Sequence, residues 1–265
     1  MYSSGGEARD DLIAGGLDLA EVGARSALAG LVQAPDSLVI VGLSGYGGDY
    51  AVAVRQDSAY RALRDLAGRS LAVRRGSGCF AALAQWASGQ GLDLQRDFRL
   101  VDLGETDAVD ALLAGRVEAI AYWQPLTNLL VGSGRAREIA SFAGATADPV
   151  FLLARAGYAG KNPEAVAAFL AAWADADQAL AANPQGAAEM GARELAAQGL
   201  SLPAEVYARS LTTDTRGVWL TPEARQAAVD LLSAMQQDGA IARDASIDWR
   251  KAWRPDYGTR AQEMR

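Results

Sequence analysis

The stretch DLIAGGLDLA (Asp11–Ala20) returns in similar form as ALLAGRVEAI (Ala111–Ile120), one hundred residues further along the chain. In each copy an apolar helical segment ends at a glycine, Gly15 or Gly115, and a short apolar strand with one acidic residue follows. Glycine is favoured just after a helix because a Cβ would clash in the left-handed conformation there. Each copy continues into a second apolar helical segment. The sequence therefore predicts one helix–strand–helix unit used twice.

The spacing of the two copies indicates two similar lobes. Solenoid proteins repeat every roughly 20–50 residues, whereas this repeat is separated by enough chain for a whole α/β lobe. Short apolar strands of this kind are typical of sheets covered by helices on both faces. We therefore expect an α/β protein with two lobes, mixed sheets flanked by helices and a ligand cleft between the lobes, where ligand sites are common.

Other apolar runs predict the remaining elements. Helices that begin near a proline are expected beyond residue 160, since a first helical turn does not need the missing N–H. The expected strands are 38–43, 50–55, 70–73, 97–102, 117–123, 137–141 and 149–155. The expected helices are 79–88, 107–114 with Thr106 as its N-cap, 163–180, 184–198, 203–211 and 222–238, followed by an irregular tail at 247–253.

Composition excludes several classes of protein. The net charge of −7 argues against a nucleic-acid surface, which needs a basic face. The chain has no histidine, which excludes His-ligated metals and nucleophiles paired with an imidazole. The single cysteine, Cys79, permits neither an internal disulfide nor a cysteine metal cluster. No apolar run reaches the roughly 18 residues of a membrane helix, so we expect no cofactor, no metal, no nucleic acid and no direct membrane insertion.

The first residues do not have the pattern of a secretory signal. Met1 is followed by YSSGG, and not by a basic and then an apolar run. The sequence leaves two alternatives, a cytoplasmic protein or a chain that begins after a removed or omitted segment.

Four segments together resemble a known family. They are VRRGSG at Val73–Gly78, LLAGRVEA at Leu112–Ala119, YWQP at Tyr122–Pro125 and KNPEAVAAFL at Lys161–Leu170. In this order and spacing they resemble the solute-binding proteins of ABC importers for aliphatic sulfonates, taurine and nitrate, a family that also includes binders of thiamine-pyrimidine precursors. The resemblance covers essentially the whole chain.

The resemblance implies a two-lobe periplasmic binding protein fold. Lobe one would comprise residues 1–54 and 151–265, and lobe two residues 55–150. Closure on the ligand would use a hinge near Val54–Arg55 and Phe151–Leu153. Family members begin with a strand, a helix and a second strand before the position that matches Ser3–Gly6. Because this unit is absent here, we expect lobe one to lack a central strand, and the chain to be unstable or to self-associate.

The function implied is capture of a small anionic or zwitterionic solute, which the protein delivers to the membrane permease of an ABC importer. Such a protein is periplasmic and not an enzyme. The alternative is a cytoplasmic enzyme of the same fold that acts on a small metabolite, as in the thiamine-pyrimidine or menaquinone pathways. Thiamine-pyrimidine synthases use a cysteine-rich motif and a histidine, which this chain lacks. Sulfonate, taurine, nitrate and pyrimidine solutes all remain open.

The turn Gly76–Phe80 joins a strand to a helix start and is the first candidate site. Free N–H groups and the helix dipole there favour an anion. The alternative is an ordinary turn capped by Ser77. Without a histidine or a second cysteine, Cys79 is better explained as a small lining residue beside Gly78 than as a nucleophile.

Matching places in the two lobes supply further candidates. Arg25 and Ser26 begin the helix after the first copy of the repeat, and Gln124 occupies the same place after the second. Arg25 is suited to pairing an anion, or is a solvated arginine at a helix start. Trp123 is either a wall for an organic ligand or a core residue.

The glycine-rich segment after strand 38–43 is the last candidate. It either forms a wall of the ligand cleft, with Tyr46 as a hydroxyl donor, or is a mobile turn. Asp18 and Glu118 occupy matching places and are expected to be structural acids at strand ends. The predicted ligand-binding residues are Arg25, Ser26, Ser44, Gly45, Tyr46, Ser77, Gly78, Cys79, Trp123 and Gln124.

Overall fold

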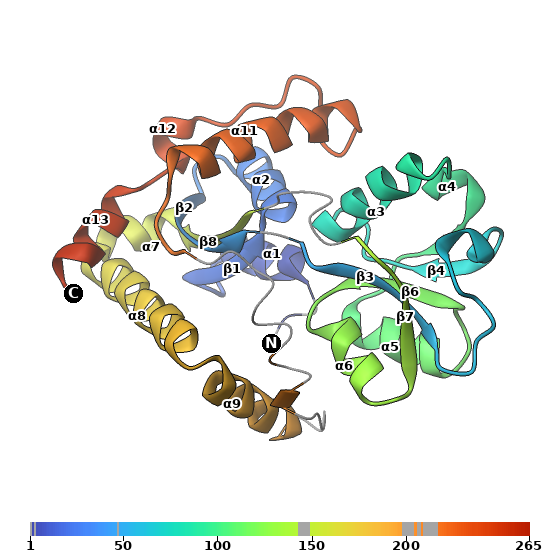
Figure 1. Cartoon of the computed structure of the whole chain (residues 1–265). Helices are drawn as coiled ribbons and strands as arrows, with labels where there is room; N and C mark the ends of the chain where they lie inside the picture. Colours follow the sequence, from blue (N-terminus) through green and yellow to red (C-terminus); the bar gives the residue numbers. More distant parts are fainter. Residues whose placement is uncertain are drawn as a thin grey trace. The chain divides into compact units, whose positions relative to one another are not determined.

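The computed structural model describes residue 2 and residues 4–46, 48–142, 149–197, 204–205, 208 and 217–265. The chain divides into two compact units, each with its own sheet (Figure 1). Unit 1 comprises Met1–Gly47, Ala147–Gln178 and Thr215–Arg265, and unit 2 comprises Gly48–Thr146 and Ala179–Asp214.

Unit 1 contains a three-stranded sheet in the order β1 (Leu19–Gly23), β8 (Pro149–Arg155), β2 (Leu38–Tyr46). The central strand β8 is antiparallel to both neighbours. Strands β1 and β2 therefore run parallel to each other, and their carboxyl ends share one edge of the sheet. The start of α2, which follows β1, and the last residues of β2 therefore lie at the same edge of the sheet.

Helices cover both faces of the unit 1 sheet. Side chains of β8 point alternately to the two faces, and both faces are apolar. Phe151 and Leu153 pack in one apolar cluster, and Leu152 and Ala154 pack in another. Figure 1 shows α2 and α11 on one side of this sheet and α8 on the other. The first face carries α1 (Gly5–Ala14), α2 (Ala24–Gln33), α11 (Pro222–Gln237) and α12 (Trp249–Ala252), and the second carries α7 (Ala156–Lys161), α8 (Pro163–Ala182) and α13 (Asp256–Glu263).

Unit 2 contains a five-stranded mixed sheet. Strands β4, β5 and β6 are parallel, so their carboxyl ends lie at one edge, while β3 is antiparallel to β6 and β7. The order is β5 (Arg99–Val101), β4 (Ser70–Ala72), β6 (Ala119–Trp123), β3 (Tyr50–Arg55), β7 (Ala136–Ser141).

Helices also cover both faces of the unit 2 sheet. One face packs against the 3₁₀ turn Leu63–Leu66, α3 (Gly78–Gly89) and α4 (Leu94–Asp97), and the other against α5 (Glu105–Leu113) and α6 (Leu126–Gly132). Helix α9 (Pro184–Ala197) is grouped with this unit, as are the last residues of α8.

The repeat is confirmed as α1–β1–α2 in unit 1 and α5–β6–α6 in unit 2. Both glycine stops have left-handed backbone angles, with φ of 87° at Gly15 and 71° at Gly115. The matching acids are structural, as expected. Asp18 pairs with Arg155, and the Glu118 carboxylate accepts a hydrogen bond from the backbone N–H of Ser70, 2.9 Å away.

Several expected elements differ in the structure. Helix α5 begins at Glu105 with Gly104 as N-cap, so Thr106 is not the cap. Asp93 caps α4, a short helix that extends to Asp97. The expected strand 97–102 is therefore shorter in the structure, where β5 covers Arg99–Val101. Asp248 caps α12 inside the tail expected to be irregular, and α13 follows it. Of the expected helix 203–211, only residues 204, 205 and 208 lie within the described structure.

The boundaries between units also differ from the expected ones. Residues 50–54 pair along their whole length with β6, so this strand belongs to unit 2 and the chain passes between units at Gly47–Gly48. Phe151–Leu153 pair with β1 and β2 inside unit 1. The hinge expected near Val54–Arg55 and Phe151–Leu153 stays a prediction. In the described part of unit 1, β1 and β2 both pair with β8, with two register shifts along β2, and self-association stays a prediction.

Candidate functional site

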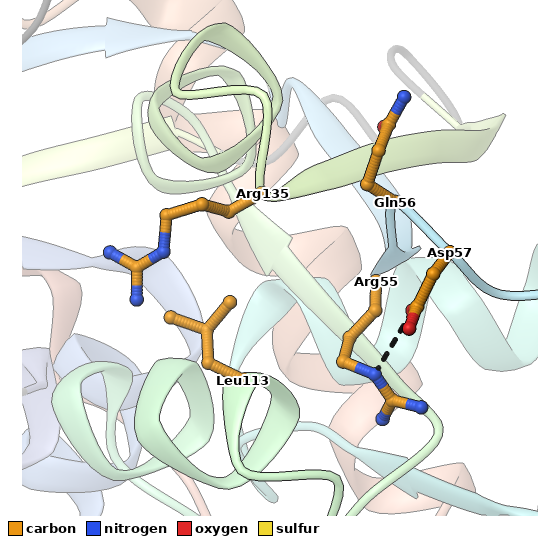
Figure 2. Close-up of a pocket in the computed structure, with 5 residues that line it drawn as sticks. All are labelled: Arg55, Gln56, Asp57, Leu113 and Arg135. Carbon is orange, nitrogen blue, oxygen red and sulfur yellow. Dashed lines mark hydrogen bonds and ion pairs between the residues drawn. The ribbon is translucent and has the colours of Figure 1, made fainter.

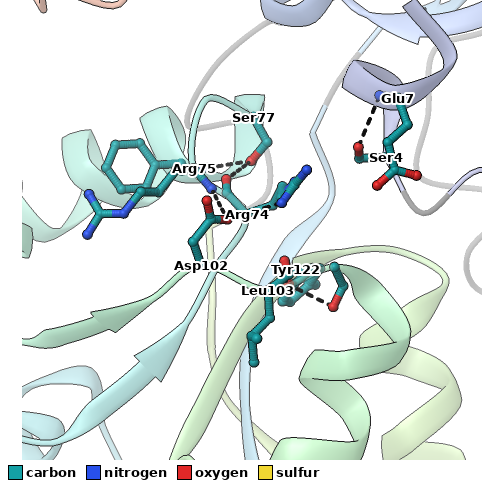
Figure 3. Close-up of polar contacts among 10 residues, drawn as sticks. Ser4, Glu7, Arg74, Arg75, Ser77, Asp102, Leu103 and Tyr122 are labelled. Atoms are coloured by element: carbon teal, nitrogen blue, oxygen red, sulfur yellow. Dashed lines mark hydrogen bonds and ion pairs between the residues drawn. The ribbon is translucent and has the colours of Figure 1, made fainter. Parts of the chain in front are cut away.

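Three loops of unit 2 meet where the parallel strands β4, β5 and β6 end. They are residues 73–77, 102–104 and 124–125, and each leads into a helix. In open α/β sheets, ligands bind outside the carboxyl ends of the strands. Figure 3 shows the polar side chains of the first two loops and Tyr122 gathered at this edge. The three loops form the candidate site of unit 2.

The first loop presents the start of α3. Ser77 is the N-cap, since its hydroxyl accepts from the Phe80 N–H at 3.2 Å and donates to the Arg74 carbonyl at 2.7 Å. Within the described part of the chain, the N–H groups of Gly78 and Cys79 have no hydrogen-bond acceptor. Free N–H groups at a helix start, together with the helix dipole, favour an anion. Capping by Ser77, which the sequence left as the alternative to an anion site, is present. The two donors beside the cap leave the anion site a prediction.

Asp102 ties the first loop to the second. Its carboxylate accepts from the backbone N–H of Arg75 at 3.0 Å and from the guanidinium of Arg74 at 3.5 Å. The Arg75 guanidinium lies 6.0 Å from the centre of the Phe80 ring. Asp102 therefore binds the guanidinium of Arg74 and the backbone of Arg75, whereas the Arg75 guanidinium lies near Phe80.

Tyr122 lies beneath these loops and is fully buried. Its hydroxyl donates to the Leu103 carbonyl at 2.6 Å, and burial raises its pKa, with a further contribution from the neighbouring Cys79. Burial also raises the pKa of the Cys79 thiol well above its usual range. Cys79 is therefore a neutral core residue. Because its side chain is buried in this cluster, the structure does not support the predicted role of that side chain in lining a ligand site.

Glu105 is the residue that sequence reasoning missed. It is the first residue of α5 and is half-buried, and its carboxylate accepts a hydrogen bond from the Trp123 side chain. Burial raises its pKa, and the Trp123 hydrogen bond lowers it by less. An acid at a helix start directly after a strand was the available signal, but capping alone also explains such an acid.

The other predicted residues of this unit have defined partners. Trp123 ends β6, where its ring centre lies 5.3 Å from that of Tyr122. The Gln124 side-chain oxygen accepts from the Asn128 N–H at 2.8 Å and so caps α6. Ser77 and Gln124 therefore lie on the loops at one edge of the unit 2 sheet, with Gly78 and Trp123 directly beside them at the start of α3 and the end of β6.

In unit 1 the predicted residues also lie at the edge where β1 and β2 end. Arg25 is only 5% exposed and donates to Asp238 at 2.7 Å, so its guanidinium stabilises the packing of α2 against α11. This pairing leaves the anion-binding role of Arg25 without support. Ser26 lies in the first turn of α2, where the N-cap Gly23 offers no side-chain acceptor.

The end of β2 supplies the remaining candidates. The Ser44 hydroxyl donates to the Glu21 carboxylate of β1, and Gly45 follows a register shift in β2. Tyr46 pairs with Pro149, and its side chain lies outside the described structure. Each half of the predicted site is therefore assembled within its own unit, and a common cleft stays a prediction.

A separate pocket of about 410 Å³ lies at the opposite edge of the unit 2 sheet, where β3 ends and β7 begins (Figure 2). Arg55 Nε contacts the Asp57 carboxylate at 3.3 Å there. The remaining lining residues are Gln56, Leu113 and Arg135. None of them was predicted as a site residue.

Across the described ranges, no cluster of three or more acidic or cysteine side chains has the arrangement needed to hold a metal ion. None of the helices in that part of the chain combines the length and apolar character needed to cross a membrane.

Solved structures identify the fold. The alkanesulfonate-binding protein SsuA from Xanthomonas axonopodis pv. citri, bound to MOPS, has a TM-score of 0.78 and 24% identity over 90% of this chain and 81% of its own. The periplasmic nitrate-binding protein NrtA from Synechocystis PCC 6803 has a TM-score of 0.73 and 17% identity over 99% and 79%. A DszB mutant in complex with biphenyl-2-sulfinic acid has a TM-score of 0.65 and 17% identity over 99% and 90%.

At these identities the similarity establishes the fold alone. The chain has the periplasmic binding protein fold, as its sequence segments implied. No curated protein matches the sequence. The sequence profile described as NMT1/THI5 like matches residues 47–187, which is more than half of the chain. The chain therefore belongs to the NMT1/THI5-like family.

Proposed function

We propose that this protein is the extracytoplasmic solute-binding component of an ABC importer. It captures a small organic solute with an anionic group and delivers it to the membrane permease. The observation that carries the proposal is the start of α3, where the N–H groups of Gly78 and Cys79 lack acceptors among the described residues. This helix start lies among strand-end loops, on a fold shared with sulfonate- and nitrate-binding proteins.

The start of α2 in unit 1 supports the same ligand chemistry. Its N-cap Gly23 makes no side-chain hydrogen bond to the first turn. A Cβ added at Gly23 would meet nothing within 4 Å. Each unit thus offers a helix start with uncapped donors at the edge where its parallel strands end. Such donors favour sulfonate, carboxylate or nitrate oxygens.

Binding without catalysis agrees with the chemistry of the site. A nucleophilic cysteine needs a lowered pKa and an accessible thiolate, whereas burial raises the pKa of Cys79. The sequence has no histidine to serve as a base at neutral pH. The hydroxyl of Ser77 is already used as a helix cap, with Arg74 as its acceptor. These groups are suited to holding a solute.

A thermal-shift screen of the whole chain tests the proposal. The panel contains alkanesulfonates, aminoalkanesulfonates, nitrate and small carboxylates, with uncharged alcohols of matching size as controls. A ligand at one hundred times its dissociation constant stabilises a protein by about 2.7 kcal/mol. We expect an anionic compound to raise the melting temperature and the alcohols to leave it unchanged. Failure of every anion to do so would contradict the proposal.

A further inference from the structure

Two arginines of unit 2 share the same pair of backbone acceptors in the turn that follows β3. Nη1 of Arg61 donates to the Ser58 carbonyl at 2.8 Å and to the Tyr60 carbonyl at 3.3 Å. Nη2 of Arg137, the second residue of β7, donates to the same two oxygens, at 2.8 Å to Ser58. Both nitrogens lie 2.8 Å from the Ser58 oxygen, so they are at most twice that distance apart. Two guanidinium groups therefore lie together at the edge of the sheet opposite the strand-end loops.

These two guanidinium groups have no carboxylate partner among the described residues. Arg55, at the start of the same turn, does have one, since it contacts Asp57 at 3.3 Å. The Asp65 carboxylate accepts from the backbone N–H of Arg61 at 2.8 Å and forms no ion pair with either guanidinium. The chain has 32 acidic residues against 25 basic ones. A shortage of acids therefore does not explain why Arg61 and Arg137 are unpaired.

A structural role for the turn does not require both arginines. Arg137 alone donates to both carbonyls, so Arg61 adds no acceptor that would otherwise lack a partner. The second guanidinium instead brings two like charges together, and these repel each other. Desolvation lowers the pKa of Arg137, and the charge of Arg61 lowers it further. A guanidinium also has more N–H donors than two carbonyls can use. The pair thus combines unused donors with positive charge that nothing in the described structure neutralises.

We propose that Arg61 and Arg137 together bind a doubly charged oxyanion, the phosphate group of a small molecule or the free ion, at a second site of unit 2. Guanidinium groups bind phosphate oxygens through parallel N–H donors. At pH 8 a phosphate group carries close to two negative charges, so it neutralises both arginines and removes their repulsion. A singly charged anion such as acetate neutralises only one. The site lies away from the strand-end loops and does not depend on the proposed function.

Titration calorimetry of the full chain with inorganic phosphate, at pH 8 and low ionic strength, tests the inference. Low salt is needed because salt screens exposed charges. We expect phosphate to bind at least about ten times more tightly than acetate, and Arg61→Gln to weaken phosphate binding by at least about tenfold. Arg64→Gln removes an exposed charge from the adjacent 3₁₀ turn and is the matched control, with an expected change of less than about twofold.

Two further comparisons define the site and its ligand. Ser77→Asp adds a negative charge at the start of α3, and phosphate binding that persists in this variant assigns the ion to the arginine pair. Loss of phosphate binding in Ser77→Asp would assign it to the strand-end loops and overturn the inference. Phenyl phosphate is titrated in parallel. Tighter binding of this ester identifies a phosphate group of an organic molecule as the ligand, and tighter binding of inorganic phosphate identifies the free ion. Either result supports the site.

Melting curves without phosphate separate a binding site from a structural pair. Arg61→Gln leaves both carbonyl bonds of Arg137 in place and removes a repelling charge, so we expect its melting temperature to equal or exceed that of the natural protein. A lower melting temperature with unchanged phosphate affinity would show that Arg61 tethers the turn, and would overturn the inference. Equal phosphate affinity in the natural protein, Arg61→Gln and Arg64→Gln would also overturn it, as would acetate binding as tight as that of phosphate.

Discussion

At the scale of single residues, Ser77 offers a direct test of anion binding. Its hydroxyl accepts from the Phe80 N–H, and aspartate is an equally good N-cap. Ser77→Asp therefore keeps an acceptor for the first turn of α3, although it loses the hydrogen bond to the Arg74 carbonyl, and it places a negative charge beside the free donors. We expect it to weaken binding of an anionic solute by more than tenfold in titration calorimetry. Gln85→Glu adds the same charge at an exposed position of α3 and is expected to have little effect. Equal affinities in all three proteins would remove Ser77 from the site.

Glu105 makes a second prediction, which concerns pH. Burial raises its pKa in the folded protein, so ionisation of Glu105 opposes folding once the pH exceeds the unfolded value of about 4.3. At lower pH the group is protonated in both states and has no such effect. Glu105→Gln should therefore melt at a higher temperature than the natural protein at pH 7, and the difference should shrink as the pH falls towards 4. Melting curves measured at pH 4 to 8 provide the test. A difference that is independent of pH would show that the charge is not responsible.

At the scale of elements, the glycine stops of the repeat have a measurable role. Gly15 adopts a φ of 87°, and a Cβ there would meet nothing within 4 Å. Any effect of Gly15→Ala is therefore conformational, and the left-handed region destabilises an L residue by about 1–2 kcal/mol. Gly157 lies in α7, also with open space around it but without a positive φ, and Gly157→Ala is expected to be neutral or stabilising. Urea unfolding measures both changes. Equal changes at the two positions would contradict the backbone explanation.

The packing of α2 against α11 provides another prediction at this scale. Arg25 is buried and its guanidinium donates to Asp238, the C-cap of α11. Asp238→Ala leaves that charge buried without its partner, so we expect destabilisation of at least about 1 kcal/mol, with solute affinity unchanged. Asp10→Ala breaks an exposed pair with Arg9 and should have an effect within about 1 kcal/mol. A loss of solute affinity in Asp238→Ala without a loss of stability would restore a ligand role for Arg25.

The sequence predicted those elements whose local signals are strong. The glycine stops at Gly15 and Gly115 and the apolar strands after them have local causes, and they are confirmed. The Ser77 cap, which the sequence left as the alternative to an anion site, is also present. Helix α13 was missed because its stability comes from distant contacts, such as the burial of Tyr257 in the cluster around α8. Glu105 and the Arg25–Asp238 pair were missed for the same reason. Their partners lie 18 and 213 residues away along the chain.

At the scale of the whole molecule, the assignment of strands to two separate sheets divides the predicted site residues between the two units. The repeat predicted two units correctly, but not that 50–55 pairs within the second sheet. That pairing depends on contacts with β6 and β7, which no local pattern specifies. The ten predicted residues therefore fall into two groups, each at the edge where the parallel strands of its own sheet end. Loops in such positions can hold a solute without reacting with it.

The central claim is that the chain binds one small anionic solute per molecule and returns it unchanged. Titration calorimetry with the best compound of the thermal-shift panel, followed by mass spectrometry of the solute recovered after prolonged incubation, tests both parts together. We predict a stoichiometry of one, weaker binding to the Ser77→Asp variant and recovery of the intact solute. Conversion of the solute to a product, or binding that is indifferent to the charge at Ser77, would contradict the account.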